Sequence, residues 1–346
     1  MKTEAAILVQ TGQPLVMAEL DIPALKPGQV LVQLAYSGAC GTQVMEWRGD
    51  KGEDKWVPHC LGHEGTGTVV DTGPGVTKVK ADQQVVLSWI KGSGIEAGGA
   101  VYDWAGRKVN AGGVTTFQRH AVVSENRLTP LPAGLSLETG VLLGCAAPTG
   151  MGAIFNVLNV RPGDAVAIFG TGGIGLNACM AAAFAGGTPV IGIDPSPARR
   201  DLARRFGASY VIDPAAGDVV AEIKKIIPQG VDLAVEASGV PQVMAQAINA
   251  TRQQGGRAVV IGNARYGSRL DLDPGVFNQG KSLMGTWGGD SVPDRDYHRF
   301  ARLIASERFP VRELLSKPYS LAQADQALQD LAAGRVGRPL IDMTIR

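Results

Sequence analysis

The sequence predicts an α/β protein with two domains, one rich in β-strands and one built on a doubly wound parallel sheet. The chain has 346 residues, which is too long for one small core. Short apolar runs between Gly and Pro turns fill residues 1–147, whereas strands and helices alternate over residues 148–287. We therefore expect one domain at residues 1–147 and 288–346, and the other at residues 148–287.

The β-rich domain is predicted from short runs that are alternating or continuously apolar, each bounded by turn residues. The expected strands are residues 5–9, 15–20, 30–35, 65–71, 84–89 and 117–123. After residue 287, helical spacing at 296–306 and 321–333 precedes a strand at 339–345. We expect this last strand to return to the first domain.

The parallel sheet is predicted from six apolar strands with crossover segments between them. The strands are residues 165–169, 189–193, 210–212, 231–236, 257–261 and 282–286. Segments such as 198–206 and 219–227 have helical spacing. Six strands joined by crossovers are typical of a doubly wound sheet.

A Gly-rich turn follows the strand at 165–169 and opens an apolar helix. Gly170, Gly172 and Gly175 have the spacing of a dinucleotide-binding loop. The first glycine allows the tight turn, the second lets a pyrophosphate approach the backbone, and the third lets helix and strand pack closely. The helix N-terminus then presents free N–H groups to the phosphates. The expected cofactor-binding turn comprises Gly170, Gly172, Gly173, Ile174 and Gly175.

Asp194 ends the second strand of this domain and points to NAD as the cofactor. A carboxylate at this position accepts hydrogen bonds from the ribose hydroxyls of NAD and repels the 2′-phosphate of NADP. Arg199 and Arg200 follow closely, and arginines can hold a 2′-phosphate. The alternative to 2′-phosphate binding is that Arg199 is a solvated helix residue whose charge borders the adenosine ribose. Because Asp194 occupies the diagnostic position, we predict NAD.

Composition and charge exclude several classes of partner. The net charge is +1, so nothing indicates a nucleic-acid or membrane partner. The first ten residues are neither a signal peptide nor a membrane span, and we expect a cytoplasmic protein. The four cysteines are widely scattered, which favours metal binding or catalysis over disulfides. Of these, Cys60 and Cys179 are expected to be packed thiols.

Cys40, His63 and Cys145 form a candidate metal site. Two thiolates and one imidazole, with a fourth position open, are typical of a catalytic zinc ion, which acts as a Lewis acid toward an alcohol. Taken singly, each residue is better explained as a buried thiol or a core histidine.

The motifs as a set resemble the zinc-dependent medium-chain dehydrogenase/reductase family, whose founding members are alcohol dehydrogenases. The resemblance covers the whole chain, through the Cys40 and His63–Glu64 motifs, Cys145, the GDAVAIFGTGGIG and VEASG runs, and the GRVGR run that ends at Arg338. It implies a GroES-like catalytic domain and a Rossmann domain. It also implies an NAD-dependent alcohol dehydrogenase whose partners are a small-molecule alcohol and the matching aldehyde or ketone.

The resemblance also implies roles for individual residues. Cys40, His63 and Cys145 would bind one catalytic zinc ion, with Glu64 beside the metal. Thr42 would pass the proton of the alcohol toward the nicotinamide ribose. The implied cofactor contacts are Thr149, Ala237, Ile261 and Trp287 at the nicotinamide and Arg338 at the pyrophosphate.

The sequence departs from the family pattern at three places. The lobe at 91–110 lacks the four cysteines of the family's second zinc site, so no structural zinc is expected. Gln43 stands where many members have Asp, so one negative charge near the metal site is missing. Met45 stands where some members have His, so the route of the proton beyond the ribose is left open. The lobe is expected to be held by a partner subunit or by packing of Val101, Tyr102, Trp104 and Val109.

The substrate is the least determined feature. Trp47, Trp56 and Trp89 predict an aromatic rim, and residues 48–55 are heavily charged. A solvated loop explains the charges more simply, but if they face the cleft, a polar, hydroxyl-rich or charged substrate follows. The chain looks nearest to the glutathione-dependent formaldehyde dehydrogenase side of the family. The alternatives are a polyol, sugar or nucleotide-sugar dehydrogenase, a zinc-free quinone or enoyl reductase, and a non-catalytic NAD-binding protein.

The strand at 282–286 predicts a homo-oligomer. It is short and apolar and would leave an open edge on the parallel sheet. Such edges are usually paired or covered, and two-fold assemblies are common. We expect a homodimer or homotetramer.

Overall fold

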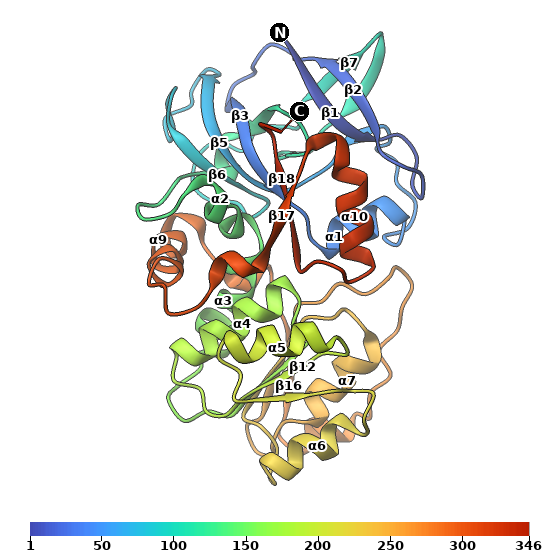
Figure 1. Cartoon of the computed structure of the whole chain (residues 1–346), viewed down its shortest axis with the longest axis vertical. Helices are drawn as coiled ribbons and strands as arrows, with labels where there is room; N and C mark the ends of the chain where they lie inside the picture. Colours follow the sequence, from blue (N-terminus) through green and yellow to red (C-terminus); the bar gives the residue numbers. More distant parts are fainter. Residues whose placement is uncertain (346) are drawn as a thin grey trace. The chain divides into compact units, whose positions relative to one another are not determined.

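The computed structural model describes residues 1–345 and divides into two compact units, each of which can be followed in Figure 1. Unit 1 comprises Met1–Cys145, Val292–Ser306 and Val311–Arg346, and unit 2 comprises Ala146–Ser291 and Glu307–Pro310. Arg346, the last residue of the expected first domain, lies outside the described residues.

The unit boundaries differ from the expected domain boundaries by a few residues. Residues 146–147, 288–291 and 307–310 belong to unit 2 rather than to the first domain. Ser291 Oγ donates a hydrogen bond to the carbonyl of Pro148 at 2.8 Å, and the ring centroid of Phe309 lies 5.1 Å from that of Phe184. These contacts join residues far apart in the sequence, so no local pattern predicted them.

Unit 1 contains a closed five-stranded barrel and a seven-stranded, mostly antiparallel sheet. The barrel order is β1 (Lys2–Leu8), β2 (Val16–Asp21), β7 (Val101–Trp104), β8 (Arg107–Asn110) and β4 (His59–Cys60). The sheet order is β10 (Leu128–Pro130), β6 (Gln84–Ser88), β5 (Glu64–Thr72), β3 (Gln29–Gly38), β18 (Arg338–Asp342) and β17 (Leu315–Tyr319), with β9 (His120–Ser124) also on β3. Alternate residues of β3, such as Val30 and Val32, pack in one core with Leu87 of β6.

The six strands expected in the β-rich part are present with small shifts at their ends. The pairing of β18 with β3 confirms that the last strand returns to the first domain. The sequence analysis missed β4, β7, β8, β10 and β17, which are short and lack a long apolar alternation.

The helices of unit 1 pack against these sheets. They are α1 (Gly41–Arg48), α2 (Leu137–Gly140), α9 (Pro293–Ile304) and α10 (Ala324–Ala332), with 3-10 helices η1 (Glu125–Arg127), η2 (Val141–Gly144), η5 (Val311–Leu314) and η6 (Leu321–Gln323). The expected helices at 296–306 and 321–333 correspond to α9 and to η6 followed by α10. Pro293 opens α9, a position where its missing N–H leaves no gap in the hydrogen bonding.

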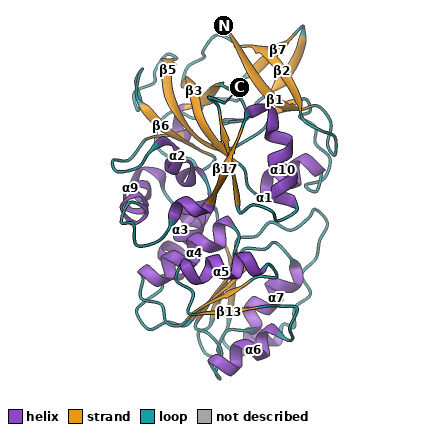
Figure 2. Ribbon diagram, in the orientation of Figure 1, coloured by secondary structure: helices purple, strands orange, loops and turns teal. Residues whose placement is uncertain are grey.

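Unit 2 is a parallel six-stranded sheet with helices packed against it (Figure 2). The strand order is β13 (Tyr210–Ile212), β12 (Val190–Ile193), β11 (Val166–Phe169), β14 (Leu233–Glu236), β15 (Arg257–Val260) and β16 (Ser282–Gly285), which confirms the doubly wound sheet. Its helices are α3 (Ala146–Gly152), η3 (Ala153–Leu158), α4 (Gly173–Phe184), α5 (Pro197–Arg205), α6 (Val219–Ile226), α7 (Pro241–Asn249), α8 (Gly275–Asn278) and η4 (Gly288–Asp290). Among the described residues no single helix could span a membrane, although the bent pair 137–144 and 146–158 passes by length and composition alone.

The lobe at 91–110 is held by side-chain contacts within unit 1. Its hairpin β7–β8 completes the barrel, and Tyr102 and Val109 are fully buried in the barrel core. The Tyr102 hydroxyl accepts a hydrogen bond from Val122 N–H at 2.8 Å. Val101, in contrast, is 46% exposed, so it does not contribute to the packing expected of it.

Glu125 fastens the segment that precedes this hairpin. Its carboxylate is fully buried and accepts three backbone hydrogen bonds of 2.7 Å, from Thr77, Lys78 and Ile95. Hydrogen bonds to a buried charge are stronger than neutral ones. One carboxylate therefore ties the 91–99 loop to the neighbouring loop at 77–78.

Replacing Glu125 by glutamine is expected to lower the free energy of unfolding by about 2–3 kcal/mol, because the amide offers one accepting oxygen to three N–H donors. The exposed ion pair of Glu96 with Lys91 provides the matched control. Glu96→Gln should cost less than about 1 kcal/mol. Urea denaturation of both variants measures the difference, and equal midpoints would contradict the role of Glu125.

Candidate metal centre and nucleotide pocket

Cys40 lies at the N-terminus of α1, directly after β3. Its Sγ accepts a hydrogen bond from Thr42 N–H at 3.4 Å, and Gln43 Oε1 accepts one from Cys40 N–H at 3.1 Å. This reciprocal pair is a capping box with cysteine in the place that Ser or Thr usually takes. Because a helix N-terminus carries partial positive charge, it favours the thiolate of Cys40.

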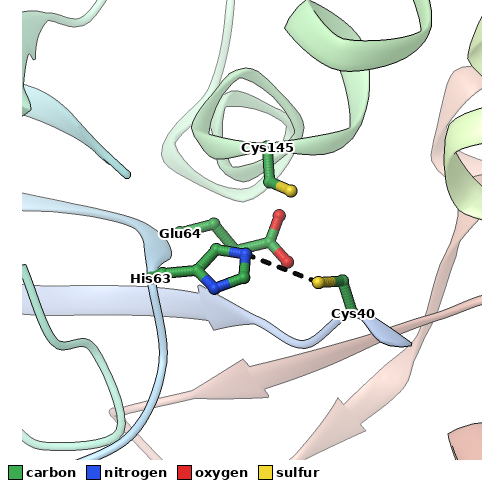
Figure 3. A group of neighbouring side chains, drawn as sticks. All are labelled: Cys40, His63, Glu64 and Cys145. Carbon is green, nitrogen blue, oxygen red and sulfur yellow. Dashed lines mark hydrogen bonds between the residues drawn. The ribbon is translucent and has the colours of Figure 1, made fainter. Parts of the chain in front are cut away.

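The three expected metal ligands and Glu64 meet at one place in unit 1. Glu64 is the first residue of β5, His63 directly precedes it, and Cys145 follows η2. The ligand atoms of Cys40, His63, Glu64 and Cys145 all lie within 4.8 Å of one another. Figure 3 shows both sulfurs and the Glu64 carboxylate gathered around the His63 ring, whose Nε2 lies 3.4 Å from Cys40 Sγ.

The thiols and the imidazole share charge in this cluster. A hydrogen bond from Cys145 and the neighbouring His63 hold the pKa of Cys40 well below its ordinary value, even though burial opposes this. The same hydrogen bond, together with burial, raises the pKa of Cys145. Burial acts to lower the pKa of His63, but the nearby Cys40 thiolate and Glu64 raise it. The lowered pKa of Cys40 favours the thiolate, which is the form that binds metals.

Glu64 and Arg338 are both buried beside the two thiols. Burial raises the pKa of Glu64 to about 7, although Arg338 acts in the opposite direction. Arg338 Nη2 lies 3.3 Å from Glu64 Oε2, yet among the described residues neither Glu64 oxygen nor Arg338 Nη2 has a hydrogen-bond partner. Arg338 faces this carboxylate, and its expected contact with a pyrophosphate stays a prediction.

The donor set fits a zinc ion. Two sulfurs and one imidazole are donors that zinc prefers, and a structural site would have four such protein ligands rather than three. The unsatisfied Glu64 oxygens add a further donor or an outer neighbour of the metal. Cys60 lies outside the cluster in the barrel core, where burial raises its pKa to about 12, which confirms it as a packed thiol.

Gln43 is a site residue whose role the sequence analysis missed. Besides capping Cys40, its Nε2 lies in close contact with Nδ1 of His63. The spacing Cys40-x-x-Gln43 is that of a capping box, and this signal could have located it. Thr42 and Met45 are both partly buried on α1, and the Trp89 ring lies edge-on to His63 with centroids 6.4 Å apart.

A pocket of about 490 Å³ lies beside the metal cluster within unit 1. Gln43 and His63 line it, together with Trp56 and Val101 of the expected rim and lobe and with Glu46, Asp54 and His59. His59 Nε2 lies 2.9 Å from Asp54 Oδ2, and Trp56 is 70% exposed. Trp47 and Trp89 are not among its lining residues, so only part of the expected aromatic rim is present here.

The Gly-rich turn of unit 2 has the backbone shape that the fingerprint implies. Gly170 has a φ of +87°, and a Cβ at Gly175 would lie 1.9 Å from the carbonyl of Gly170. A Cβ at Gly172 would meet nothing within 4 Å, so this glycine leaves open space above the turn. The helix α4 begins at Gly173, whose neighbours present their N–H groups at its N-terminus.

A pocket of about 240 Å³ adjoins this turn and is lined by Gly170, Gly172, Asp194, Arg199 and Ala237. The Asp194 carboxylate is buried and accepts hydrogen bonds from Thr171 N–H and Ser196 N–H, both at 2.9 Å. Arg199 Nη1 lies 4.0 Å from it. The three other predicted nicotinamide contacts do not line this pocket: Thr149, buried in α3, Ile261, after β15, and Trp287, 74% exposed after β16. Gly173, Ile174 and Gly175 of the turn and Arg338 of unit 1 are not among its lining residues either.

Two family models match the chain. Residues 26–133 match the alcohol dehydrogenase GroES-like domain, and residues 173–306 match the zinc-binding dehydrogenase family. Together these ranges cover most of both units.

Relatives and solved structures agree with these matches. The chain is 33% identical to S-(hydroxymethyl)glutathione dehydrogenase of Synechocystis sp., over 84% of this chain and 86% of the relative. It is 32% identical to the NDMA-dependent alcohol dehydrogenase of Amycolatopsis methanolica, over 99% of both chains. The benzyl alcohol dehydrogenase of Acinetobacter calcoaceticus superposes with a TM-score of 0.89 at 27% identity, and covers 99% of both chains.

Proposed function

The chain belongs to the zinc-dependent medium-chain alcohol dehydrogenase family, and from this premise we propose that it oxidises an alcohol to its aldehyde or ketone with NAD as hydride acceptor. The observation that carries the proposal is the convergence of Cys40, His63 and Cys145 within 4.8 Å beside a pocket. The fully assembled ligand set also argues against a zinc-free reductase.

The proposed roles are those that the family resemblance implies, and the convergence of Cys40, His63 and Cys145 supports those of the metal ligands. Cys40, His63 and Cys145 would hold the zinc ion, which when bound would supply Lewis acidity that lowers the pKa of an alcohol. Glu64 and Arg338 form a buried charged pair beside these ligands. Thr42, two residues after Cys40 in the first turn of α1, would supply the hydroxyl that takes the alcohol proton.

The experiment that tests this function is an alcohol panel monitored by NADH formation, with and without a zinc chelator. Benzyl alcohol and S-(hydroxymethyl)glutathione are the first substrates, because related proteins are named for them. The proposal is supported if a chelator removes the activity and added zinc restores it. NAD binding without NADH formation for any alcohol would instead indicate a non-catalytic NAD-binding protein.

The pocket beside His63 favours an alcohol that carries a second polar group. Glu46 and Asp54 line the pocket together with Trp56 and Val101. A hydroxyl-rich substrate can donate hydrogen bonds to such carboxylates, whereas ethanol has no second hydroxyl to donate. Polyols and sugars therefore belong in the panel as the second candidate class.

Preference for NAD over NADP is expected to depend on Asp194. Replacing it by serine removes the charge that repels a 2′-phosphate, and should reduce the NAD/NADP ratio of kcat/KM by about 10–100-fold. Asp201→Ser, on the exposed face of α5, is the control and should leave the ratio unchanged. A wild-type protein that uses NADP with higher kcat/KM would show that Arg199 and Arg200 dominate.

A homodimer or homotetramer is expected because β16 forms an open edge of the parallel sheet. A second copy could pair with this strand and extend the sheet across a two-fold axis. Light scattering at micromolar concentration should report two or four chains of 36.1 kDa. A fully active protein with the mass of one chain would contradict this assembly.

A further inference from the structure

Gln43 is buried between the backbone of Cys40 and the ring of His63, with only 1% of its surface exposed. Its Oε1 accepts the Cys40 N–H at 3.1 Å, and its Nε2 contacts Nδ1 of His63. A side-chain amide has one accepting end and one donating end. The backbone donor at Cys40 therefore holds the oxygen, and the NH₂ group is turned toward His63.

This orientation decides which nitrogen of His63 carries the ring proton. Because the NH₂ group can only donate, it favours the neutral form of His63 in which Nδ1 accepts and Nε2 carries the proton. Nε2 lies 3.4 Å from the Cys40 sulfur, and the dashed line in Figure 3 joins these two atoms. A metal ion in the cluster needs the lone pair of Nε2, and the ring proton must then lie on Nδ1.

We propose that Gln43 is a positioning residue with two orientations. In one, its oxygen caps α1 at Cys40, and in the other, its oxygen turns to accept the Nδ1–H of a metal-bound His63. The proposal rests on the zinc site proposed above, and adds that loading this site breaks the capping hydrogen bond at Cys40.

The amide therefore makes metal binding weaker than a carboxylate would at the same position. Glutamate has two accepting oxygens, so it can accept from Cys40 N–H and from His63 Nδ1–H together. Groups that support a metal-bound histidine typically change metal affinity by about 10–100-fold. We expect that range between Gln43→Glu and the wild type.

The first test reads the His63 ring directly. The chain has only four histidines, so the full-length protein labelled with ¹⁵N-histidine gives few imidazole signals, and the His63 signal is the one lost in His63→Gln. We expect a proton on Nε2 in the metal-free wild type and on Nδ1 after zinc loading. A proton on Nδ1 in the metal-free wild type would overturn the proposal.

The second test measures zinc affinity by competition with a chelator. Gln43→Glu should bind zinc about 10–100-fold more tightly than the wild type, and Gln43→Met, which lacks both polar ends, should bind it more weakly. Gln33→Glu adds the same charge at an exposed position of β3 and should change the affinity by less than about twofold.

Three outcomes are distinguishable. If Gln43 only caps α1, Gln43→Glu and the wild type should bind zinc equally well, because glutamate also accepts from Cys40 N–H. Equal affinities would overturn the inference about Gln43 but not the proposed function. A wild type that binds no zinc overturns both. Tighter binding without the change of tautomer would be an effect of charge, and it too overturns the inference.

Discussion

Cys145→Ala is expected to reduce the zinc content from one ion per chain to a small fraction, and to abolish alcohol oxidation. The variant leaves one sulfur and one imidazole in a cluster whose remaining neighbours, Glu64 and Arg338, form a buried charged pair. Changes in groups that merely support metal ligands already cost about 10–100-fold in affinity, so loss of a direct ligand should exceed about 100-fold. Elemental analysis of the purified protein measures this directly.

Cys60→Ala provides the matched control for this prediction. Cys60 is equally buried, but it packs in the barrel core outside the ligand cluster. We expect this variant to retain one zinc ion per chain while losing some stability. Undiminished zinc in Cys145→Ala would show that the metal is bound elsewhere, and two tightly held ions in the wild type would reveal a second site.

Thr42→Val is expected to reduce kcat by about 10²–10⁴-fold while zinc and NAD still bind, because a well-placed proton-transfer group typically contributes that much. Thr42 follows Cys40 closely on α1, and its backbone N–H, which the variant keeps, donates to the Cys40 sulfur. Valine preserves the shape of the side chain and removes only the hydroxyl. Met45, one helical turn along from Gly41, offers no group that could replace it.

Thr42→Ser keeps the hydroxyl and should recover most of the lost turnover, which separates proton transfer from packing. Steady-state kinetics with elemental analysis of each variant measures both effects. A near-normal kcat in Thr42→Val would mean that another route carries the proton.

The sequence by itself determined the parts of the fold that depend on local patterns. The Gly170–Gly175 turn could be assigned because the backbone of a dinucleotide-binding turn needs glycine at these positions. The structure shows Gly170 at a positive φ and no room for a Cβ at Gly175. The central parallel strands could be assigned because every residue of β11, β12 and β14 is buried, which leaves continuous apolar runs. The short strands β7 and β8 could not, because they are only four residues long and lack a long apolar alternation, although they pair with each other as a hairpin.

At the site, the sequence identified Cys40, His63 and Cys145 as candidate ligands, whereas tertiary structure alone showed that they meet. Cys145 is more than eighty residues from His63, and only the folding of η2 against β5 brings their donor atoms within 4.8 Å. The contact of Gln43 with His63, the pairing of Arg338 with Glu64 and the buried Glu125 carboxylate also depend on packing between distant segments. Residue type and spacing therefore specify the chemistry that is available, while long-range packing decides which groups share a buried space and hence their charge and their hydrogen bonds.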